Sequence, residues 1–315
     1  MYTLVTLVTL VKPLFFTFEA TETVTLSPKS QIPPPRPVLH CRIYVALMLK
    51  ALPWLTNLYV SRAMMSTSST AAATTTTGPI HHNVQRMIES PTFDTWPFQP
   101  EDFNRRDESS DVSFYSQPRF VKHIDDECIA SLSNVYSQLF HENDAVLDLC
   151  SSWISHFPTE PSLGNVVGVG MNEQELAAND RLDSYVVKDL NHEPLLPFED
   201  ESFDYVVNAV SVDYLSNPKE IFNEMWRVLK PNGVAVMSWS NRMFPTKVID
   251  MWLRVSEEER VKIVQAYFLH NGAPFTNVHG YEMKTTGTDP LYVVVGEKSR
   301  KQDGGRDSDS ASSSL

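Results

Sequence analysis

Hydrophobic residues in the second half of the chain alternate between helical spacing and short continuous runs. Asp125 and Asp126 place negative charge in the first turn of one helical pattern, and Asn217 and Pro218 form a cap-and-proline start for another. Helices are predicted over 124–139, after Asn172, over 217–229 and over 246–270. Strands are predicted at 145–149, 165–170, 185–187, 203–210, 234–240, 278–283 and 292–297. This alternation predicts an α/β fold with a doubly wound, mostly parallel seven-stranded sheet and helices on both faces, whose ligands bind beyond the carboxyl ends of the strands.

Changes in amino-acid composition along the chain divide it into four predicted segments. Residues 1–90 are predicted to be a disordered, transit-like leader, because residues 1–88 hold seven basic and only two acidic residues together with a Ser/Thr/Ala run. Residues 91–122 are interpreted as an aromatic-rich arm on the domain surface. Residues 123–297 form the predicted domain, and residues 298–315, rich in Ser, Asp and Gly, are expected to be a disordered tail.

The leader also carries the prediction of location. A chloroplast is the first expectation, with the mitochondrion or the cytoplasm as alternatives, the last especially if translation starts at Met64 or Met65. Its two apolar stretches, 2–18 and 43–60, are each interrupted by lysine and proline, so an integral membrane segment is disfavoured.

Charge and cysteine content narrow the function further. The chain of 315 residues carries a net charge of −13, which disfavours a nucleic-acid partner and favours a small-molecule substrate. Three cysteines without a CxxC pair indicate a reducing compartment and no structural zinc. The nine histidines show no HxxxH or HxH spacing, so no metal site is expected. The oligomeric state cannot be inferred from the sequence.

Several short blocks occur in a recognisable order. They are Val146-Leu147-Asp148, Val166-Val167-Gly168-Val169, Asp189-Leu190, Leu196-Pro197-Phe198, Ser202-Phe203-Asp204 and the segment from Glu224 to Gly233 that contains RVLKPNG. In this order they resemble the class I S-adenosylmethionine-dependent methyltransferases, specifically those with the methyltransferase type 11 domain. The resemblance covers about residues 120–297. It implies the Rossmann-like methyltransferase fold and methyl transfer from S-adenosyl-L-methionine to an unidentified acceptor.

The resemblance also implies a cofactor site. Asp148 matches the acid that supports the loop and the cofactor's amino-acid end. Asp189 matches the acceptor of the adenine amino group, with the Leu190 N–H donating to the ring, although Asp189 is also placed to cap a turn. Asn208 matches a residue that faces the sulfonium. The implied cofactor-binding residues are Asp148, Cys150, Ser151, Ser152, Gly170, Met171, Asn172, Asp189, Leu190 and Asn208.

Two departures from the family pattern weaken this site. Cys150, Ser152 and Ile154 stand where the family has glycines, which allow positive φ and close approach of the backbone. Side chains here would crowd the methionine moiety, while the nearby hydroxyls would be able to donate to an anion near a helix start.

The second departure is Gly170, which replaces the carboxylate that binds both ribose hydroxyls. Ribose contacts are left to Asn172, Glu173 or the backbone, at a cost of about 1–3 kcal/mol.

Two functions therefore stay open: a divergent methyltransferase, or a catalytically inactive methyltransferase fold that acts as a binding or scaffold protein. The arm around residues 114–120 is either a lid over the cofactor or plain packing, and Cys150 is expected to be a buried structural cysteine rather than a nucleophile. No catalytic residue is assigned. If the acceptor needs a base, the candidates at the strand ends are His192, Asp213, Tyr214 and Asn241.

Overall fold

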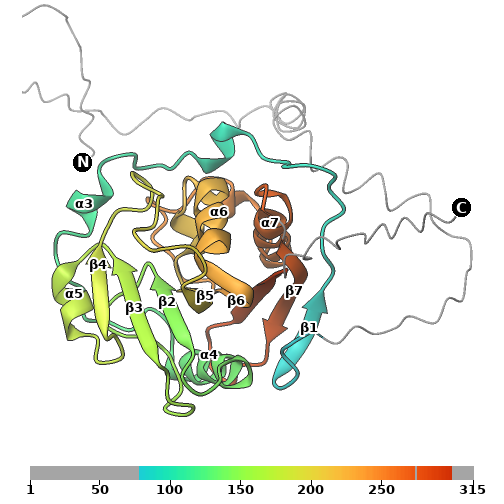
Figure 1. The fold of residues 1–315 in the computed structure, drawn as a ribbon. Helices are drawn as coiled ribbons and strands as arrows, with labels where there is room; N and C mark the ends of the chain where they lie inside the picture. The colour runs from blue at the N-terminus through green and yellow to red at the C-terminus, as the bar shows by residue number, and fades with distance from the viewer. Residues whose placement is uncertain (1–77, 274, 300–315) are drawn as a thin grey trace, which may run out of the picture. The chain divides into compact units, whose positions relative to one another are not determined.

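The computed structural model describes residues 78–273 and 275–299, which build one eight-stranded sheet with helices on both faces (Figure 1). Its strand order is β1-β7-β8-β6-β5-β2-β3-β4. The strands are β1 Val84–Ile88, β2 Ala145–Leu149, β3 Asn165–Gly170, β4 Ser184–Val187, β5 Phe203–Ala209, β6 Leu229–Trp239, β7 Phe275–Met283 and β8 Leu291–Lys298. The helices are α3 Asp111–Phe114, α4 Asp126–Leu139, α5 Glu173–Ala178, α6 Pro218–Val228 and α7 Glu257–His270. Most of the predicted leader and all but two residues of the predicted tail lie outside the described residues.

Strands β4, β3, β2, β5 and β6 are parallel, whereas β8, β7 and β1 continue the sheet with antiparallel pairs. The predicted doubly wound, mostly parallel sheet is confirmed, with one strand more than the seven expected. The chain reverses direction along the sheet between β4 and β5, which lie on opposite sides of β2 and β3. Ligands of open α/β sheets bind at the strand ends where this happens.

The additional strand, β1, lies within the segment predicted to be a leader and pairs with β7 at one edge of the sheet. Hydrophobic patterning gives no signal for it, because only Ile88 of its five residues is buried. Its side chains contact the domain through ion pairs instead: Arg86 lies 3.0 Å from Glu282 of β7 and 2.7 Å from Glu258 of α7. The fold therefore includes residues that precede position 91.

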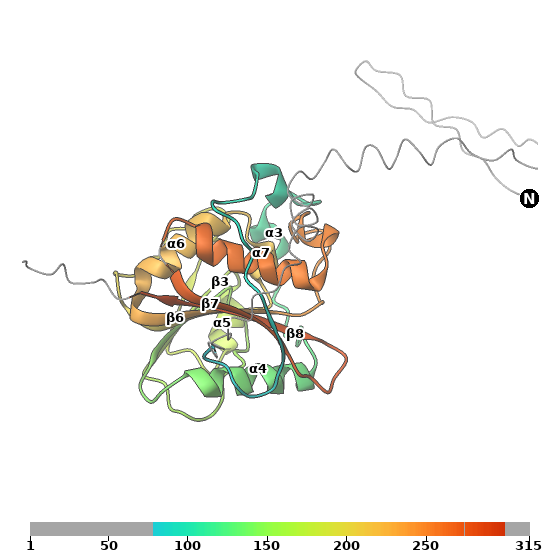
Figure 2. The same cartoon turned by 90° about the vertical axis from the view of Figure 1, so that its right-hand side faces the viewer.

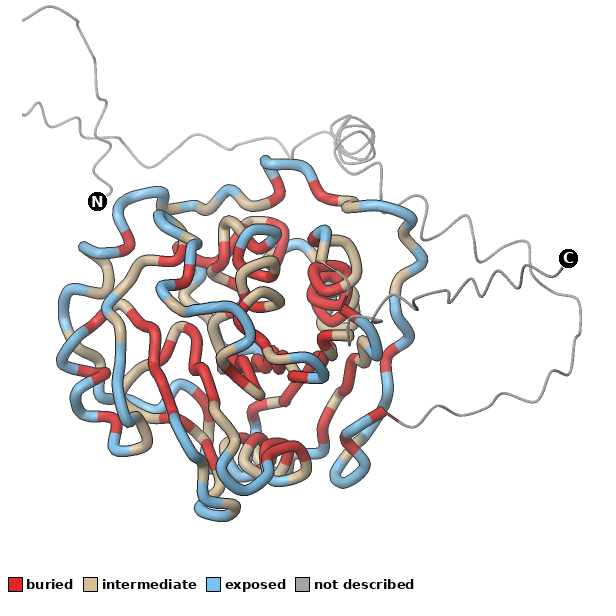
Figure 3. Tube along the Cα trace, in the orientation of Figure 1, coloured by how far each residue is buried: buried red, intermediate tan, exposed pale blue. Residues whose placement is uncertain are grey.

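Helices cover the two faces of the sheet unequally (Figure 2). Helix α4 packs one apolar stripe, Cys128, Leu132 and Val135, onto one face. On the other face α6 and α7 meet through Phe222, whose ring lies 5.5 Å from Tyr267 and 4.8 Å from Phe268. Burial is greatest along the central strands between these layers (Figure 3).

Two segments differ from their predicted secondary structure. The helix expected over 246–270 is shorter, because Ser256 and Glu259 form a capping box that starts α7 at Glu257. Residues 150–164 after β2 contain no helix, so the loop that follows Asp148 does not lead into a helix start. None of the helices within 78–273 and 275–299 is long and apolar enough to cross a membrane.

Candidate functional site

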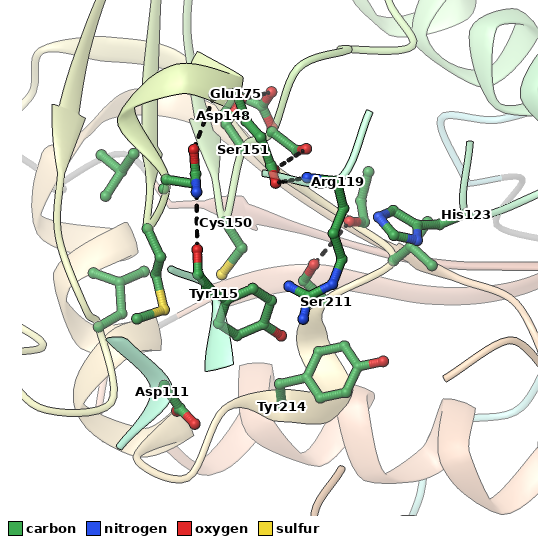
Figure 4. A pocket seen from close by; sticks show the side chains of 18 of the residues that line it. Asp111, Tyr115, Arg119, His123, Asp148, Cys150, Ser151, Glu175, Ser211 and Tyr214 are labelled. Atoms are coloured by element: carbon green, nitrogen blue, oxygen red, sulfur yellow. Dashed lines mark hydrogen bonds between the residues drawn. The ribbon is translucent and has the colours of Figure 1, made fainter. Parts of the chain in front are cut away.

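A cavity of about 280 Å³ lies at the carboxyl ends of β2, β3, β4 and β5 (Figure 4). The arm before α4 and the loop around Phe244 contribute its other walls. Nine of the ten predicted cofactor-site residues line it: Asp148, Cys150, Ser151, Ser152, Gly170, Met171, Asn172, Asp189 and Leu190. The tenth, Asn208, lies outside this lining and is buried, with 1% of its surface exposed. Its amide donates to the Leu149 carbonyl at 3.1 Å. Nine of the predicted residues thus share one site, Asn208 does not line it, and binding of a cofactor there stays a prediction.

One carboxylate oxygen of Asp148 is held by the loop that follows it. Ser151 and Ser155 both donate their hydroxyls to Oδ2 of Asp148 at 2.7 Å. Burial raises the pKa of Asp148 to about 6, although the two hydroxyl donors oppose this shift. The Ser152 hydroxyl donates to Glu175 Oε2 at 2.6 Å. Because each hydroxyl has one proton to donate, the three serines are used within the protein, which corrects the expectation that they await an anion.

Cys150 keeps a glycine-like backbone without being glycine. Its φ is +57°, in the left-handed region, which costs a non-glycine residue on the order of 1 kcal/mol. Burial and the charge of Asp148 raise the pKa of the Cys150 thiol to about 12, so the thiol stays protonated and is no nucleophile at neutral pH.

The loss of glycines after Asp148 and the gain of a glycine at position 170 are linked in the structure. The main chain of Ser151 lies across the end of β3, with the Ser151 N–H donating to the Val169 carbonyl at 2.8 Å. A Cβ on Gly170 would lie 2.2 Å from the Ser151 carbonyl oxygen, a distance that no side chain tolerates. The loop that holds Ser151, Ser152 and Ser155, called the serine loop below, therefore restricts position 170, where the family pattern has the ribose carboxylate, to glycine.

Asp189 follows β4, and its two carboxylate oxygens have different environments. Its Oδ1 accepts hydrogen bonds from the backbone N–H groups of Asn191 at 3.0 Å and His192 at 3.3 Å, so it does cap a turn. No described residue donates to Oδ2, and the residue lines the cavity beside Leu190. One carboxylate oxygen is thus fixed by the turn, while the other has no hydrogen-bond partner among the described residues.

The arm forms a wall of the cavity. Asn172 donates its amide to the Tyr115 carbonyl at 2.9 Å, and Glu175 Oε1 accepts from the Arg119 backbone N–H at 2.6 Å. Tyr115 and Arg119 line the cavity as a result. The Asn172 side-chain oxygen caps α5, so the ribose contact expected from Asn172 has no free amide, and Glu173 lies outside the lining.

Aromatic residues nearer the start of the arm have a packing role. The Trp96 ring lies 5.8 Å from Tyr267 of α7, and the Phe98 ring lies 5.3 Å from the same residue. The arm thus packs against α7 before η2 (Pro100–Phe103) and forms a cavity wall after α3, while the choice between a lid and plain packing for residues 114–120 stays a prediction.

A buried cluster of charge fixes the arm to the loop that follows β6. Lys247 is 0% exposed, and its ammonium lies 3.3 Å from Asp107 Oδ2 and 3.2 Å from Asp111 Oδ1. Arg105 donates to Asp111 Oδ2 at 2.6 Å. Sequence reasoning missed this cluster, because its members are far apart in the chain and no short motif joins them.

Of the four candidate bases, Tyr214 alone lines the cavity. Burial and the neighbouring Asp213 carboxyl raise its pKa, so the phenol is protonated and is a poor base. Asp213 is 2% exposed and lies outside the lining, in η3 (Val212–Tyr214), while His192 and Asn241 are exposed.

Asp213→Asn is expected to stabilise the protein at alkaline pH. Burial raises the pKa of Asp213 to about 7, and its Oδ1 has no hydrogen-bond partner. Because the unfolded carboxyl ionises near pH 4, the wild type loses stability as pH rises from about 4 to 7. The amide removes this loss, which predicts a gain of about 1–3 kcal/mol at pH 8 and little change at pH 4. Urea unfolding across this pH range measures it; equal gains at both pH values would contradict the assignment.

Comparisons with known proteins agree with this architecture. Residues 150–237 match the model of a family described as a methyltransferase domain. The chain is 29% identical over 66 residues to a malonyl-[acyl-carrier protein] O-methyltransferase of Marinomonas, covering 21% of this chain and 24% of that protein. It is 37% identical over 71 residues to the chloroplastic 2-methyl-6-phytyl-1,4-hydroquinone methyltransferase 2 of rice, covering 20% of this chain and 19% of that protein. In each case the chain matches less than a quarter of the relative's length.

A solved structure gives a weaker likeness. A putative S-adenosylmethionine-dependent methyltransferase of Listeria monocytogenes aligns with a TM-score of 0.40 and 13% identity, covering 54% of this chain and 99% of that one.

Proposed function

We propose that this chain is a class I methyltransferase that transfers the methyl group of S-adenosyl-L-methionine to a small-molecule acceptor, since its residues 150–237 match a methyltransferase domain. The observation that supports this most is the cavity at the strand ends, where Asp189 keeps one carboxylate oxygen free beside Leu190. The bound cofactor supplies an electrophilic methyl group on its sulfonium.

The residues present fit the two ends of this cofactor better than its middle. Asp189 and the Leu190 N–H would hold the adenine ring, and the loop after Asp148 would support the amino-acid end. At the ribose, Gly170 offers no carboxylate, and Ser151 prevents one from being introduced. We therefore expect affinity to depend more strongly on Asp189 than in a site with a ribose carboxylate.

The chain's own contribution to the reaction is orientation and exclusion of water. Tyr115 and Phe244 line the cavity with aromatic side chains. The Asn172 amide, at the start of α5, holds the backbone of Tyr115 in place. No lining group is assigned as a base: the pKa of His156 is lowered to about 4 by burial, which leaves a weakly basic imidazole.

Asp189→Asn tests the proposal most directly. The amide oxygen still accepts from the turn, so the NH₂ group points at the position where the adenine amino group needs an acceptor. Binding of S-adenosylhomocysteine, measured by calorimetry, is expected to weaken about 30- to 150-fold, equivalent to about 2–3 kcal/mol.

Asp180→Asn is the matched control, since Asp180 is exposed beyond the end of α5 and lies outside the cavity lining; it is expected to change binding less than twofold. Equal affinities for wild type and Asp189→Asn would contradict the adenine assignment.

A catalytically inactive fold that binds a partner is the second candidate. The engaged serine hydroxyls and the missing ribose carboxylate favour it. Absence of S-adenosylhomocysteine and S-adenosylmethionine binding to the wild type at millimolar concentration would support this alternative and overturn the first proposal.

We also propose that residues 1–90 contain a plastid-targeting segment, supported by the acid-poor leader and by the chloroplastic name of the rice relative. The structure moves two predicted boundaries, because β1 (Val84–Ile88) lies within the predicted leader and Lys298 is the last residue of β8 rather than the first of the tail. Fusing residues 1–90 to a fluorescent protein tests it, and uniform cytosolic fluorescence in plant cells would contradict it.

A further inference from the structure

Arg119 differs from the other cations around the cavity in having no acidic partner. Its Nη2 donates to the Phe114 carbonyl at 2.8 Å, while Nη1 is shielded from solvent and has no hydrogen-bond partner. The four other lysines and arginines of the lining each form an ion pair: Arg105 with Asp111, Lys188 with Glu193, Arg242 with Asp289, and Lys247 with Asp107 and Asp111. Within the described residues, Arg119 forms none.

The position of the guanidinium is fixed before any ligand binds. Its carbon lies 4.6 Å from the centre of the Phe114 ring and 5.6 Å from those of Tyr115 and Phe244. The backbone of Arg119 is held by Glu175, whose two oxygens are occupied by the Arg119 N–H and the Ser152 hydroxyl. In Figure 4 the side chain extends across the cavity toward Ser211, at the end of β5.

A buried donor without an acceptor is unfavourable, typically by about 1–3 kcal/mol, unless a ligand supplies the acceptor. A guanidinium presents parallel N–H groups whose spacing matches a carboxylate, and such pairs are stronger than neutral hydrogen bonds. A phosphate is less well matched, because the neighbouring cations are already neutralised by protein carboxylates. We propose that Arg119 is the residue that binds a ligand carboxylate in this cavity.

Two carboxylates fit this inference, which rests on the proposed function: that of the methionyl end of the cofactor, and that of an acidic acceptor. The shared chemistry is a carboxylate that accepts hydrogen bonds from the Arg119 guanidinium, which has no acidic partner among the described residues. The two sources differ in which ligand loses affinity when the guanidinium is removed.

The first experiment compares S-adenosylhomocysteine with 5′-methylthioadenosine, which lacks the amino-acid end, by calorimetry on the full chain. If the cofactor carboxylate is the ligand, Arg119→Met is expected to weaken S-adenosylhomocysteine about 10- to 100-fold and methylthioadenosine less than twofold. Arg106→Met is the matched control, since Arg106 is exposed and lies outside the cavity lining, and it is expected to leave both affinities within twofold.

The second experiment titrates benzoate and its uncharged analogue benzamide into protein saturated with S-adenosylhomocysteine. If the carboxylate comes from the acceptor, Arg119→Met loses benzoate binding at least tenfold, while benzamide and S-adenosylhomocysteine are unchanged. Arg119→Lys retains the charge without the fork, so an intermediate affinity in either experiment would show that the effect is recognition rather than misfolding; thermal unfolding of each variant accompanies the titrations.

Unchanged affinity of Arg119→Met for both S-adenosylhomocysteine and benzoate would overturn the inference. If the wild type binds neither S-adenosylhomocysteine nor methylthioadenosine, it is the proposed function that fails. The benzoate titration of the ligand-free protein then still decides the role of Arg119: a tenfold loss in Arg119→Met supports it, and no loss overturns it.

Discussion

Gly170→Ala is expected to destabilise the protein by about 3 kcal/mol or more, an unusually large effect for the addition of one methyl group. Alanine normally favours an element interior over glycine by about 0.5–1 kcal/mol, so the loss comes from the contact and not from backbone preference. The added Cβ would lie 2.2 Å from the Ser151 carbonyl oxygen, which is main chain and cannot rotate away. Urea unfolding at equilibrium measures the change.

Gly168→Ala on the same strand is the matched control. Its added Cβ would meet Cδ1 of Leu182 at 2.5 Å, and the end of a leucine side chain can shift. We expect a loss of about 1 kcal/mol there. A Gly170→Ala protein as stable as the Gly168→Ala protein would mean that the serine loop moves easily.

The same contact bears on attempts to restore a ribose carboxylate. Gly170→Asp is expected to bind S-adenosylhomocysteine more weakly than the wild type despite carrying the family's acid, because the loop at Ser151 must first be displaced. Tighter binding by this variant would contradict the coupling between the loop and the strand end.

Lys247→Met is expected to destabilise the protein by about 3–5 kcal/mol, because it removes one of the two cations that compensate the buried Asp111 carboxylate. Lys247 is fully buried and lies 3.2 Å from Asp111, and its ammonium also donates to the Ser109 carbonyl at 2.6 Å. The loss should be accompanied by faster proteolysis within the arm, since these contacts hold it against the loop after β6. Thermal unfolding and limited proteolysis measure the two effects.

Lys122→Met provides the comparison, because the Lys122–Asp126 pair at 2.6 Å is exposed on both sides. An exposed pair of this kind is worth about 0–1 kcal/mol. If both variants lost equal stability, burial of the Lys247 cluster would not be the source of its strength. In Lys247→Met, Arg105 remains as a second cation for Asp111, and this sets the lower end of the expected loss, about 3 kcal/mol.

Most of the fold follows from local pattern, because seven strands and the longer helices carry their own apolar runs or stripes. The predicted start of the helix after Asn217 agrees with α6, where Pro218 is the first helical residue. Strand β1 has no such signal, since its contribution comes from ladder hydrogen bonds and ion pairs with β7 and α7. The segment after β2 was expected to approach a helix start, but its residues form hydrogen bonds with their neighbours in space instead.

The candidate site was predictable only where the chain passes the ends of the strands. Asp148 and Asp189 could be predicted from their positions near the end of β2 and in the turn that follows β4. Their environments do not, because the partners of the serine loop, Glu175 and Asn179, come from α5 and its C-terminal end. Arg119 could not be identified from sequence at all, since its significance lies in a partner that it lacks.

The arm is secured to the domain at both of its ends. Before it, β1 is hydrogen-bonded to β7; after it, Asp125 caps α4 and accepts from the Asp289 N–H at 3.0 Å. A segment released from the cavity would therefore remain a tethered flap, and its return would be an intramolecular event at an effective concentration on the order of millimolar. Closure of such a flap would be a first-order step that is independent of protein concentration and depends on the length of the tether.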